Sequence, residues 1–597
     1  MAFLLGAVTA SLFIRSAYTA TLADVCTSSY VTASLPEDQW SIGDVDNNII
    51  FDRTSITANP VYNASSGSSD FYPEGVFDYC NVTLAYSHAG RNDRVNLVYW
   101  LPAPDSFQNR YLSTGGGGFA INSGTNSLPG GLLYGAASGA TDGGFGSFDT
   151  QFDATFPIEN GTANYETLYM FGYQAIHELG LVGKQLTRNF FQMANGTKLY
   201  SYYQGCSEGG RDGWSQVQRF GDSFDGAITG APAFRFSFQQ TQHLYSNVVE
   251  QTVGYYPPPC ELEKILNETI AFCDPLDGKT DGVVSRTDLC KLHFNASSVI
   301  GQPYSCAATS GASGGGPPAK KKRQLGGAGG SSSSTPAQNG TVTAQGAQVA
   351  QLIIDGLKDS TGRQVYFSYQ PSASFDDAAT QYNNESGQWE LSINTMGSEW
   401  ITRFLWLQNT SDFESLDGVT YDTLKNWMIQ GWHMYQDSLE TTWPDLTPYR
   451  EAGGKILHFH GESDPSIPAA SSVRFHESVR SVMYPGLSFN ESTAELSKWY
   501  KLFLVPGAAH CAPSSTQPNG PFPNTNMAVM IDWVEKGIEP QTLNATVLQG
   551  DYAGEKQSLC AWPLRPQWTD DMLECVYDQS SIDTWNYDLS AVPLPVY

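Results

Sequence analysis

The chain of 597 residues is about four times as long as a typical domain, so we expect more than one compact unit. Hydrophobic residues make up 41% of the chain and charged residues only 15%, which excludes disorder of the whole chain. The chain has 60 acidic and 32 basic residues, which gives a net charge of −28. This negative charge repels nucleic-acid phosphates and anionic lipids. We therefore expect neither nucleic acid nor a membrane surface among its partners.

Several features predict export from the cell. Residues 1–20 are typical of a secretory signal peptide, with an apolar stretch followed by small residues. No later stretch is long and apolar enough to predict a membrane span. Ten cysteines, an even number, favour disulfide bonds. Eleven Asn-x-Ser/Thr sequons indicate glycosylation, at Asn63, Asn81, Asn160, Asn195, Asn267, Asn295, Asn339, Asn384, Asn409, Asn490 and Asn544. The chain is thus predicted to be secreted and extracellular.

Strand and helix patterns alternate along much of the chain, as they do in α/β proteins. Four short apolar segments are predicted as strands: Arg110–Ser113, Lys198–Gln204, Lys455–His460 and Lys501–Val505. A glycine run, Gly115–Gly118, follows the first of them. A tight glycine-rich turn follows the second and leads into a helix predicted from Arg211.

The turn after Lys198–Gln204 carries the pattern G-x-S-x-G as Gly205-Cys206-Ser207-Glu208-Gly209. In a nucleophile elbow the turn between strand and helix is too tight for side chains beside the serine, which explains the two glycines. The pentapeptide alone is a weak signal, but its place between a strand and a helix predicts that Ser207 is a nucleophile.

A nucleophilic serine needs a base and an acid that orients the base, and α/β-hydrolases carry them in the order Ser, acid, His. Asp464 follows the strand Lys455–His460, and His510 follows the strand Lys501–Val505. We predict Asp464 and His510 as these partners. His458 and His460 alternate on a strand and could bind a metal, but one core and one surface position is the simpler interpretation.

The oxyanion of an acyl-transfer intermediate needs backbone N–H donors that are already in place. One donor is predicted at Glu208, directly after the nucleophile, and the other at Gly118 in the glycine run. A merely flexible turn is the alternative for that run.

A second compact motif lies in Cys273–Val283, where three aspartates alternate with glycines. Their carboxylates, with two backbone carbonyls, could surround one cation, and such hard oxygen ligands suit Ca²⁺ better than Zn²⁺. The predicted ligands are Asp274, Asp277, Asp281 and the carbonyls of Lys279 and Val283. A plain Asp-Gly turn is the alternative, and any bound Ca²⁺ is expected to be structural.

Residues from about 307 to 337 are rich in Gly, Ser, Ala and Pro and predict an exposed flexible loop. The loop contains the basic run Lys320–Arg323. A nuclear localisation signal would contradict the signal peptide, so a cleavage site for a kexin-type processing protease, after Arg323, is the favoured interpretation.

These motifs together resemble the tannase and feruloyl esterase family. The resemblance is carried by CSEGGR around Ser207, HGESDP around Asp464 and the pair His510-Cys511, and it extends from about Cys26 to the C-terminus. It implies a secreted serine esterase most similar to the fungal members that hydrolyse galloyl esters and depsides of tannins to gallic acid. The alternative is a feruloyl esterase acting on plant cell-wall phenolic esters. A hydrolase-fold binding protein is disfavoured because all three triad positions are present.

The family hallmark is a disulfide between the cysteines that adjoin the serine and the histidine, here Cys206–Cys511. With that resemblance, the remaining pairs are proposed as Cys26–Cys80, Cys273–Cys290, Cys560–Cys575 and Cys260–Cys306. Because only Cys206–Cys511 crosses Arg323, it would hold together the two chains that cleavage produces.

The resemblance also implies an α/β-hydrolase core with a large inserted lid domain. The 257 residues from Ser207 to Asp464 are far more than one or two βα units need. We assign the catalytic domain to 21–232 and 448–597 and the lid, with the calcium loop and the processed loop, to 233–447. The lid tryptophans could stack on a phenolic ring, but no galloyl-binding residue can be named from the sequence.

Overall fold

The computed structural model describes residues 20–38, 41–42, 45–46, 48–67, 69–148, 158–159, 161–309, 335–410, 413–570 and 572–597. The predicted signal peptide, apart from residue 20, and Arg323 with most of its loop lie outside these ranges. Among the helices in the described ranges, none has the length and apolar character needed to cross a bilayer.

Within the described residues, nine strands form one mixed sheet in the order β17-β16-β11-β10-β6-β7-β5-β4-β3. The strands from β17 to β7 run parallel, and the last three pair antiparallel. The strands are β3 (Ile49–Ser65), β4 (Val76–His88), β5 (Val95–Pro102), β6 (Arg110–Thr114), β7 (Ala136–Thr141), β10 (Tyr200–Cys206), β11 (Gly226–Gly230), β16 (Lys455–Gly461) and β17 (Tyr500–Val505).

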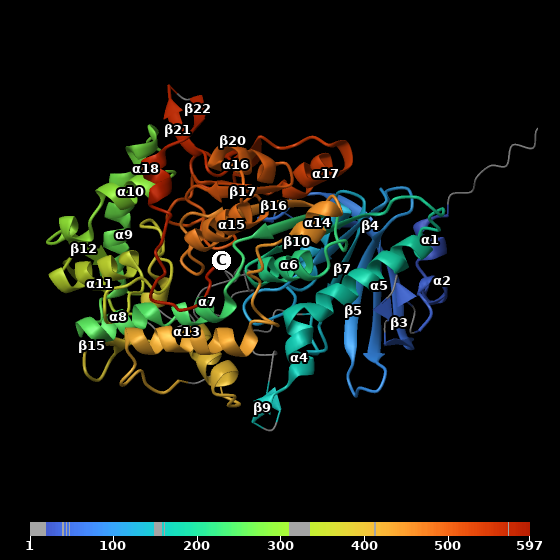
Figure 1. The fold of residues 1–597 in the computed structure, drawn as a ribbon, viewed down its shortest axis with the longest axis horizontal. Helices are drawn as coiled ribbons and strands as arrows, with labels where there is room; N and C mark the ends of the chain where they lie inside the picture. The colour runs from blue at the N-terminus through green and yellow to red at the C-terminus, as the bar shows by residue number, and fades with distance from the viewer. Residues whose placement is uncertain are drawn as a thin grey trace, which may run out of the picture.

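Helices cover both faces of this sheet (Figure 1). Because side chains alternate along a strand, Tyr202 of β10 packs with Met530 of one helix layer, while the next residue, Tyr203, packs into the other. On the second face, Trp214 contacts Phe475 and Tyr500 edge to face. The helices are α5 (Ala175–Phe190), α6 (Glu208–Arg219), α15 (Ala469–Met483) and α16 (Phe489–Ser497) on that face, and α3 (Pro129–Leu132) and α17 (Asn526–Lys536) on the other. The predicted α/β-hydrolase fold is confirmed.

All four predicted strand segments form strands of the parallel part of the sheet. β6 pairs with β10 and β16 pairs with β17, and β11 lies between these two pairs. The predicted start of the following helix at Arg211 was wrong by three residues, since α6 begins at Glu208. The reason is local: the Arg211 N–H donates to the Ser207 carbonyl at 3.0 Å, so the first helical turn starts directly at the serine.

A long insertion, residues 231–454, connects β11 to β16, which are hydrogen-bonded neighbours in the sheet. Apart from the last of them, its helices lie together on one side of the molecule, at the left and bottom of Figure 1. They are α7 (Phe236–Gln242), α8 (Tyr245–Val253), α9 (Pro259–Cys273), α10 (Thr287–His293), α11 (Ala344–Asp355), α12 (Thr395–Glu399) and α13 (Tyr421–Tyr435), with α14 (Thr447–Glu451) leading back to the sheet. The insertion contains the segment 233–447 that was assigned to a lid.

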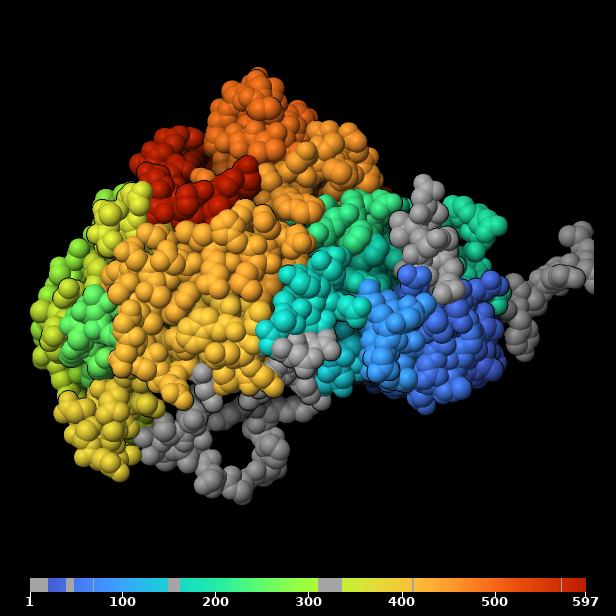
Figure 2. All heavy atoms as spheres, turned by 60° about the horizontal axis from the view of Figure 1, so that its bottom comes forward, coloured from blue at the N-terminus to red at the C-terminus, as the bar shows by residue number. Residues whose placement is uncertain are grey.

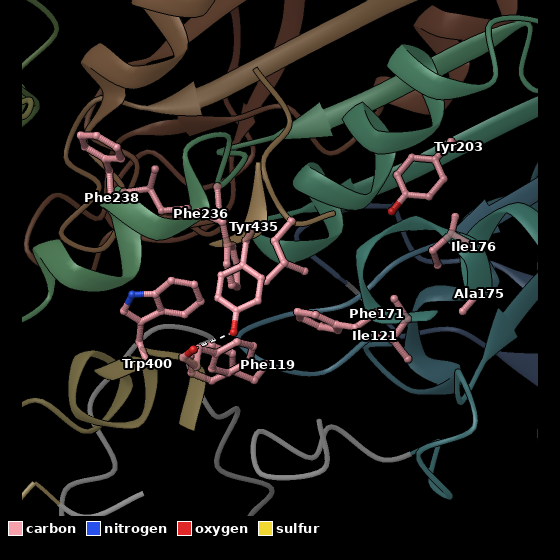
Figure 3. Close-up of a cluster of buried hydrophobic side chains, with 14 of the residues drawn as sticks. Phe119, Ile121, Phe171, Ala175, Ile176, Tyr203, Phe236, Phe238, Trp400 and Tyr435 are labelled. Atoms are coloured by element: carbon pink, nitrogen blue, oxygen red, sulfur yellow. Dashed lines mark hydrogen bonds between the residues drawn. The ribbon is translucent and has the colours of Figure 1, made fainter. Parts of the chain in front are cut away.

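An aromatic cluster joins the insertion to the hydrolase core (Figure 3). The Phe236 ring, on α7, lies 6.1 Å from the Phe119 ring beside the glycine run and 5.5 Å from the Trp400 ring. Tyr435 donates its hydroxyl hydrogen bond to the Phe404 carbonyl at 2.6 Å. These buried rings fix the beginning of α7 against the loop that follows β6.

The C-terminal residues pack against the insertion. Buried Arg286 pairs with Asp578 at 2.9 Å, and Arg565 pairs with Asp288 at 3.0 Å. Figure 2 shows the last residues, in red, lying against the orange and yellow surface of the insertion. This region contains β18 (Pro521–Phe522), β19 (Thr542–Val547), β20 (Lys556–Cys560), β21 (Arg565–Thr569), β22 (Met572–Val576) and α18 (Gln579–Asp583).

The remaining elements are short and peripheral to the sheet. They are α1 (Leu22–Val25), α2 (Ser28–Ser34), β1 (Ser41–Ile42), β2 (Val45–Asp46), β8 (Ile158–Glu159), β9 (Thr162–Ala163), α4 (Tyr165–Tyr169), β12 (Pro303–Cys306), β13 (Gln338–Thr341), β14 (Thr380–Asn383) and β15 (Gln388–Leu391).

Candidate active site

Ser207 lies in the turn between β10 and α6, with a backbone φ of 66° and ψ of −123°. A non-glycine residue at positive φ is strained, and here the Ser207 N–H is held by the Gly230 carbonyl of β11 at 2.9 Å. A Cβ at Gly205 would lie 2.5 Å from the Gly209 carbonyl oxygen, and a Cβ at Gly209 would lie 2.9 Å from the Gly116 oxygen. At both positions any side chain would collide with neighbouring backbone atoms, so both residues must be glycine.

Charged side chains beneath the turn connect α6 to the glycine run. Arg211 is fully buried, pairs with the carboxylates of Glu208 and Asp212, and donates to the Phe171 carbonyl at 2.9 Å. Burial raises the pKa of both carboxylic acids, and Arg211 opposes that effect. Asp212 Oδ2 also accepts the Gly116 N–H at 3.2 Å. The glycine run is thus held against the N-terminus of α6.

The two predicted oxyanion donors lie on the same cleft as the nucleophile. Gly118, at φ 63°, lines the cleft together with Ser207 and Glu208. The Gly209 N–H donates to the Gly116 carbonyl at 3.0 Å, which fixes the glycine run next to the serine turn. The backbone N–H groups of Glu208 and Gly118 remain the predicted donors to an oxyanion.

Asp464 follows β16 and is almost fully buried, with 1% of its surface exposed. Its Oδ1 accepts the N–H groups of Ser466 and Ile467 at 2.8 and 2.9 Å. Its Oδ2 lies 2.7 Å from Nδ1 of His510 and 3.1 Å from Nε2 of His460. Burial by itself would raise the pKa of Asp464, but the two histidines hold that pKa below its ordinary value.

His460 was not predicted as part of the site. Its Nδ1 lies 2.6 Å from Ser472 Oγ, which also lies 2.8 Å from Nε2 of His458, and the His458 Nδ1 lies 2.9 Å from the Tyr500 hydroxyl. The interpretation of His458 and His460 as one core and one surface position was wrong. Both are buried, because residues two apart on a strand point to the same face, here the face covered by α15.

His510 is brought to the serine through its neighbour. The Cys206–Cys511 disulfide, with a Cα–Cα distance of 6.1 Å, joins the residue before Ser207 to the residue after His510. Since Nδ1 of His510 faces Asp464, its Nε2 is the nitrogen left to accept a proton. The arrangement has the parts needed for general-base activation of a serine.

The cleft beside Ser207 is narrow, with about 10 Å³ of space open to the centres of water-sized molecules. Its walls come from the glycine run, the start of α6, the acid loop and the insertion. The lining residues are Gly118, Ser207, Glu208, Ala233, Phe236, Gln239, Gln240, His243, Met396, Ser466 and Ile467. Trp389, Trp400, Trp406, Trp427 and Trp432, the lid tryptophans considered for ring stacking, are all described residues and none of them lines it.

In the predicted calcium loop, backbone N–H groups and one ammonium group contact the aspartate carboxylates. Asp274 accepts the N–H groups of Asp281 and Gly282, and Lys279 Nζ lies 3.0 Å from Asp281 Oδ2. Burial raises the pKa of Asp277 to about 6. Among the described residues, no three acidic, histidine or cysteine side chains form a ready-made metal ligand set.

All ten cysteines lie in the described ranges and are paired, with Cα–Cα distances between 5.2 and 6.1 Å. The pairs are Cys26–Cys80, Cys206–Cys511, Cys260–Cys306, Cys273–Cys290 and Cys560–Cys575, which are the five expected disulfides.

Comparison with known proteins identifies close relatives of this chain. Residues 80–582 match the family model described as tannase and feruloyl esterase. The chain is 51% identical over 582 residues to a tannase of Aspergillus oryzae, covering 97% of each protein. It is 31% identical to a probable feruloyl esterase of Arthroderma benhamiae, covering 85% of this chain and 88% of the relative.

Solved structures of similar fold include proteins with the same two activities in their names. The tannin acyl hydrolase from Aspergillus niger has a TM-score of 0.90 and 60% identity, with coverage of 97% of this chain and 99% of that one. Feruloyl esterase B from Aspergillus oryzae has a TM-score of 0.65 and 24% identity, with coverage of 90% and 98%. The second comparison shows the shared fold alone.

The Cys206–Cys511 disulfide generates a prediction about positioning. Replacing both cysteines by alanine should remove most turnover of an activated ester at temperatures where the fold survives. A base displaced by about 1 Å can cost on the order of a hundredfold in rate. The matched control is Cys560→Ala with Cys575→Ala, which removes a disulfide away from the cleft and should lower Tm but keep kcat. Near-normal kcat in the Cys206/Cys511 variant below its Tm would contradict the positioning role.

Proposed function

The chain belongs to the tannase and feruloyl esterase family, and we propose that it is a carboxylic ester hydrolase that cleaves galloyl ester and depside bonds of hydrolysable tannins to release gallic acid. The observation that carries the reaction class is the buried Asp464–His510 contact of 2.7 Å beside the strained turn of Ser207. The substrate class is supported by 60% identity to the tannin acyl hydrolase from Aspergillus niger, against 24% to feruloyl esterase B.

In the proposed reaction, Ser207 Oγ attacks the ester carbonyl while Nε2 of His510 takes the hydroxyl proton. The N–H groups of Glu208 and Gly118 donate to the oxyanion of the tetrahedral intermediate. The C–O bond to the alcohol then breaks, the alcohol leaves with the proton from His510, and the acyl group remains on Ser207. Water repeats these steps, with His510 as base, and releases the acid. Asp464 keeps the imidazole oriented and stabilises its charged form.

The alternative activity is hydrolysis of feruloyl esters. Its support is the second activity in the family description and the 31% identical relative, a probable feruloyl esterase. Comparing kcat/KM for methyl gallate and methyl ferulate separates the two: we expect a clear preference for methyl gallate. Ser207→Ala should reduce turnover to a few percent or less, because only the attacking atom is lost. Ser215→Ala, which changes a serine of α6 outside the cleft, should retain turnover. Preference for methyl ferulate would establish the alternative.

We also propose a structural Ca²⁺ in the loop Cys273–Val283. Its support is the charge of the loop, where Asp274, Asp277 and Asp281 are largely buried and Lys279 is their one cationic neighbour in the loop. Carboxylate and carbonyl oxygens are the ligands that Ca²⁺ prefers, and the carbonyls of Lys279 and Val283 would complete the set.

Chelation and Asp277→Ala should each lower Tm, by at least about 2 °C, without changing the kcat of enzyme that remains folded. The two treatments should not add, since they remove the same ion. Asp105→Ala, an exposed aspartate outside the loop, is the control. Purified protein without calcium by elemental analysis would rule the site out.

We further propose that the protein is secreted, glycosylated and cleaved after Arg323 by a kexin-type protease. The support is in the sequence: the apolar N-terminal segment, the sequons and the basic run in a Gly/Ser-rich loop. Cys206–Cys511 is the one disulfide whose cysteines lie on opposite sides of Arg323.

On this basis the mature protein should run as two glycosylated pieces on a reducing gel and as one species without reductant. Arg323→Ala together with Lys322→Ala should give a single piece under both conditions. One full-length band of the unmodified protein under reduction would show that cleavage does not occur.

A further inference from the structure

Four buried polar side chains form a hydrogen-bonded network that ends at Asp464. His458 and His460 lie on β16, Ser472 lies on α15, and Tyr500 is the first residue of β17. All four residues of this buried network have an exposed fraction of 0%. Buried polar groups normally have hydrogen-bond partners, so the hydrogens of the network can be assigned from the contacts of its atoms.

The contacts of His460 fix its Nε2 as a donor. This nitrogen lies 3.1 Å from Oδ2 of Asp464 and 3.0 Å from the carbonyl oxygen of Ile467. A carbonyl oxygen can only accept, and Asp464 is ionised because its pKa is held below the ordinary value. Since two acceptors face Nε2 of His460, that nitrogen must carry a hydrogen.

The other members of the buried network hold the opposite side of the His460 ring. Ser472 Oγ lies 2.6 Å from Nδ1 of His460 and 2.8 Å from Nε2 of His458. Nδ1 of His458 lies 2.9 Å from the Tyr500 hydroxyl. Burial lowers the pKa of His458 well below its ordinary value, so this ring is neutral and has a single N–H. The hydrogen bonds of the network therefore all point in one direction, either towards Asp464 or away from it.

Both directions leave the same donor at Asp464. Donation towards Asp464 begins with the Tyr500 hydroxyl, which donates to His458. It continues from His458 through Ser472 to a neutral His460. In the opposite direction, a charged His460 gives its second N–H to Ser472. In each case all four ring nitrogens have a partner, and Nε2 of His460 donates to Asp464.

The carboxylate of Asp464 has two donors on each oxygen when His460 is included. Oδ1 accepts from the N–H groups of Ser466 and Ile467, and Oδ2 faces His460 and His510. Loss of the His460 donor would leave a buried charged oxygen with one partner instead of two, which costs free energy. The carboxylate would then be free to turn, and the His510 ring that it orients would turn with it.

We propose that His460 is a positioning residue of the triad, which donates to Asp464 and is held in that role by the rest of the buried network. The proposal rests on the proposed ester hydrolysis. His460 is not among the residues that line the cleft, so it would act on the reaction through Asp464 and His510. Its loss should therefore lower kcat and leave KM unchanged.

The first test compares two substitutions of His460 with methyl gallate as substrate. In His460→Leu, which cannot donate, we expect kcat to fall about tenfold and KM to stay within about twofold. In His460→Gln the amide nitrogen takes the place of Nε2, and kcat should stay within about threefold of the unmodified enzyme. His177→Leu is the control, since His177 stacks on Phe220 and does not line the cleft.

The second test changes the support of the His460 ring and keeps the histidine. Ser472→Ala should lower kcat to a value between those of the unmodified enzyme and His460→Leu, because Nδ1 of His460 loses its partner. Ser478→Ala is the matched control on the same helix, since the Ser478 hydroxyl donates to the Arg474 carbonyl at 2.8 Å, outside the network. This control should retain kcat.

A spectroscopic measurement does not depend on turnover. The hydrogen between Nδ1 of His510 and Asp464 should give a proton resonance far downfield, because a hydrogen bond to a buried carboxylate is strong. We expect this resonance to move in His460→Leu and in Ser472→Ala, and to keep its position in Ser478→Ala.

A normal kcat per folded molecule and an unmoved resonance in His460→Leu, with only a lower Tm, would overturn the proposal. So would a His460→Gln enzyme that is as slow as His460→Leu. If His460→Leu does not fold, Ser472→Ala against Ser478→Ala decides the question by the same two measurements. Full turnover in Ser207→Ala would instead refute the proposed serine mechanism, and this inference with it.

Discussion

The buried carboxylate of Asp464 is the constraint on which the rest of the site depends. A charge without solvent is costly unless hydrogen bonds and opposite charge compensate for it. Two backbone N–H groups hold one oxygen, and His510 and His460 face the other. The same contacts that stabilise the charge also fix the acid loop, and they set the orientation of the histidine that the reaction would use.

The topology of the sheet delivers these groups to one place. Because β10, β16 and β17 run parallel, the turns after them lie at the same edge, and they carry Ser207, Asp464 and His510. The insertion does not disturb this arrangement, since it begins and ends on the adjacent strands β11 and β16. The Cys206–Cys511 disulfide then joins the first turn to the last.

Local sequence signals predicted much of this site, and tertiary contacts account for what they missed. The elbow could be predicted because G-x-S-x-G is a local motif. Gly205 is required by its close approach to the Gly209 backbone, and Gly209 by its close approach to Gly116 of the glycine run. The start of α6 was misplaced because it depends on one hydrogen bond to Ser207. His460 was missed although Asp464 follows it by four residues, because its contacts depend on which face of β16 is covered by α15. The contact of Gln239 on α7 with Ser466 could not be predicted, since the two residues are distant in sequence and no motif links them.

The sheet and the insertion contribute different groups to the site. The groups proposed for bond cleavage lie at the sheet edge, where parallel strands and a disulfide fix their geometry. Gln239 and Gln240, which line the cleft, lie on α7, and the ring of Phe236 anchors α7 to the core. Substitutions of Gln239 or Gln240 therefore change the lining of the cleft on an element other than those that carry Asp464 and His510.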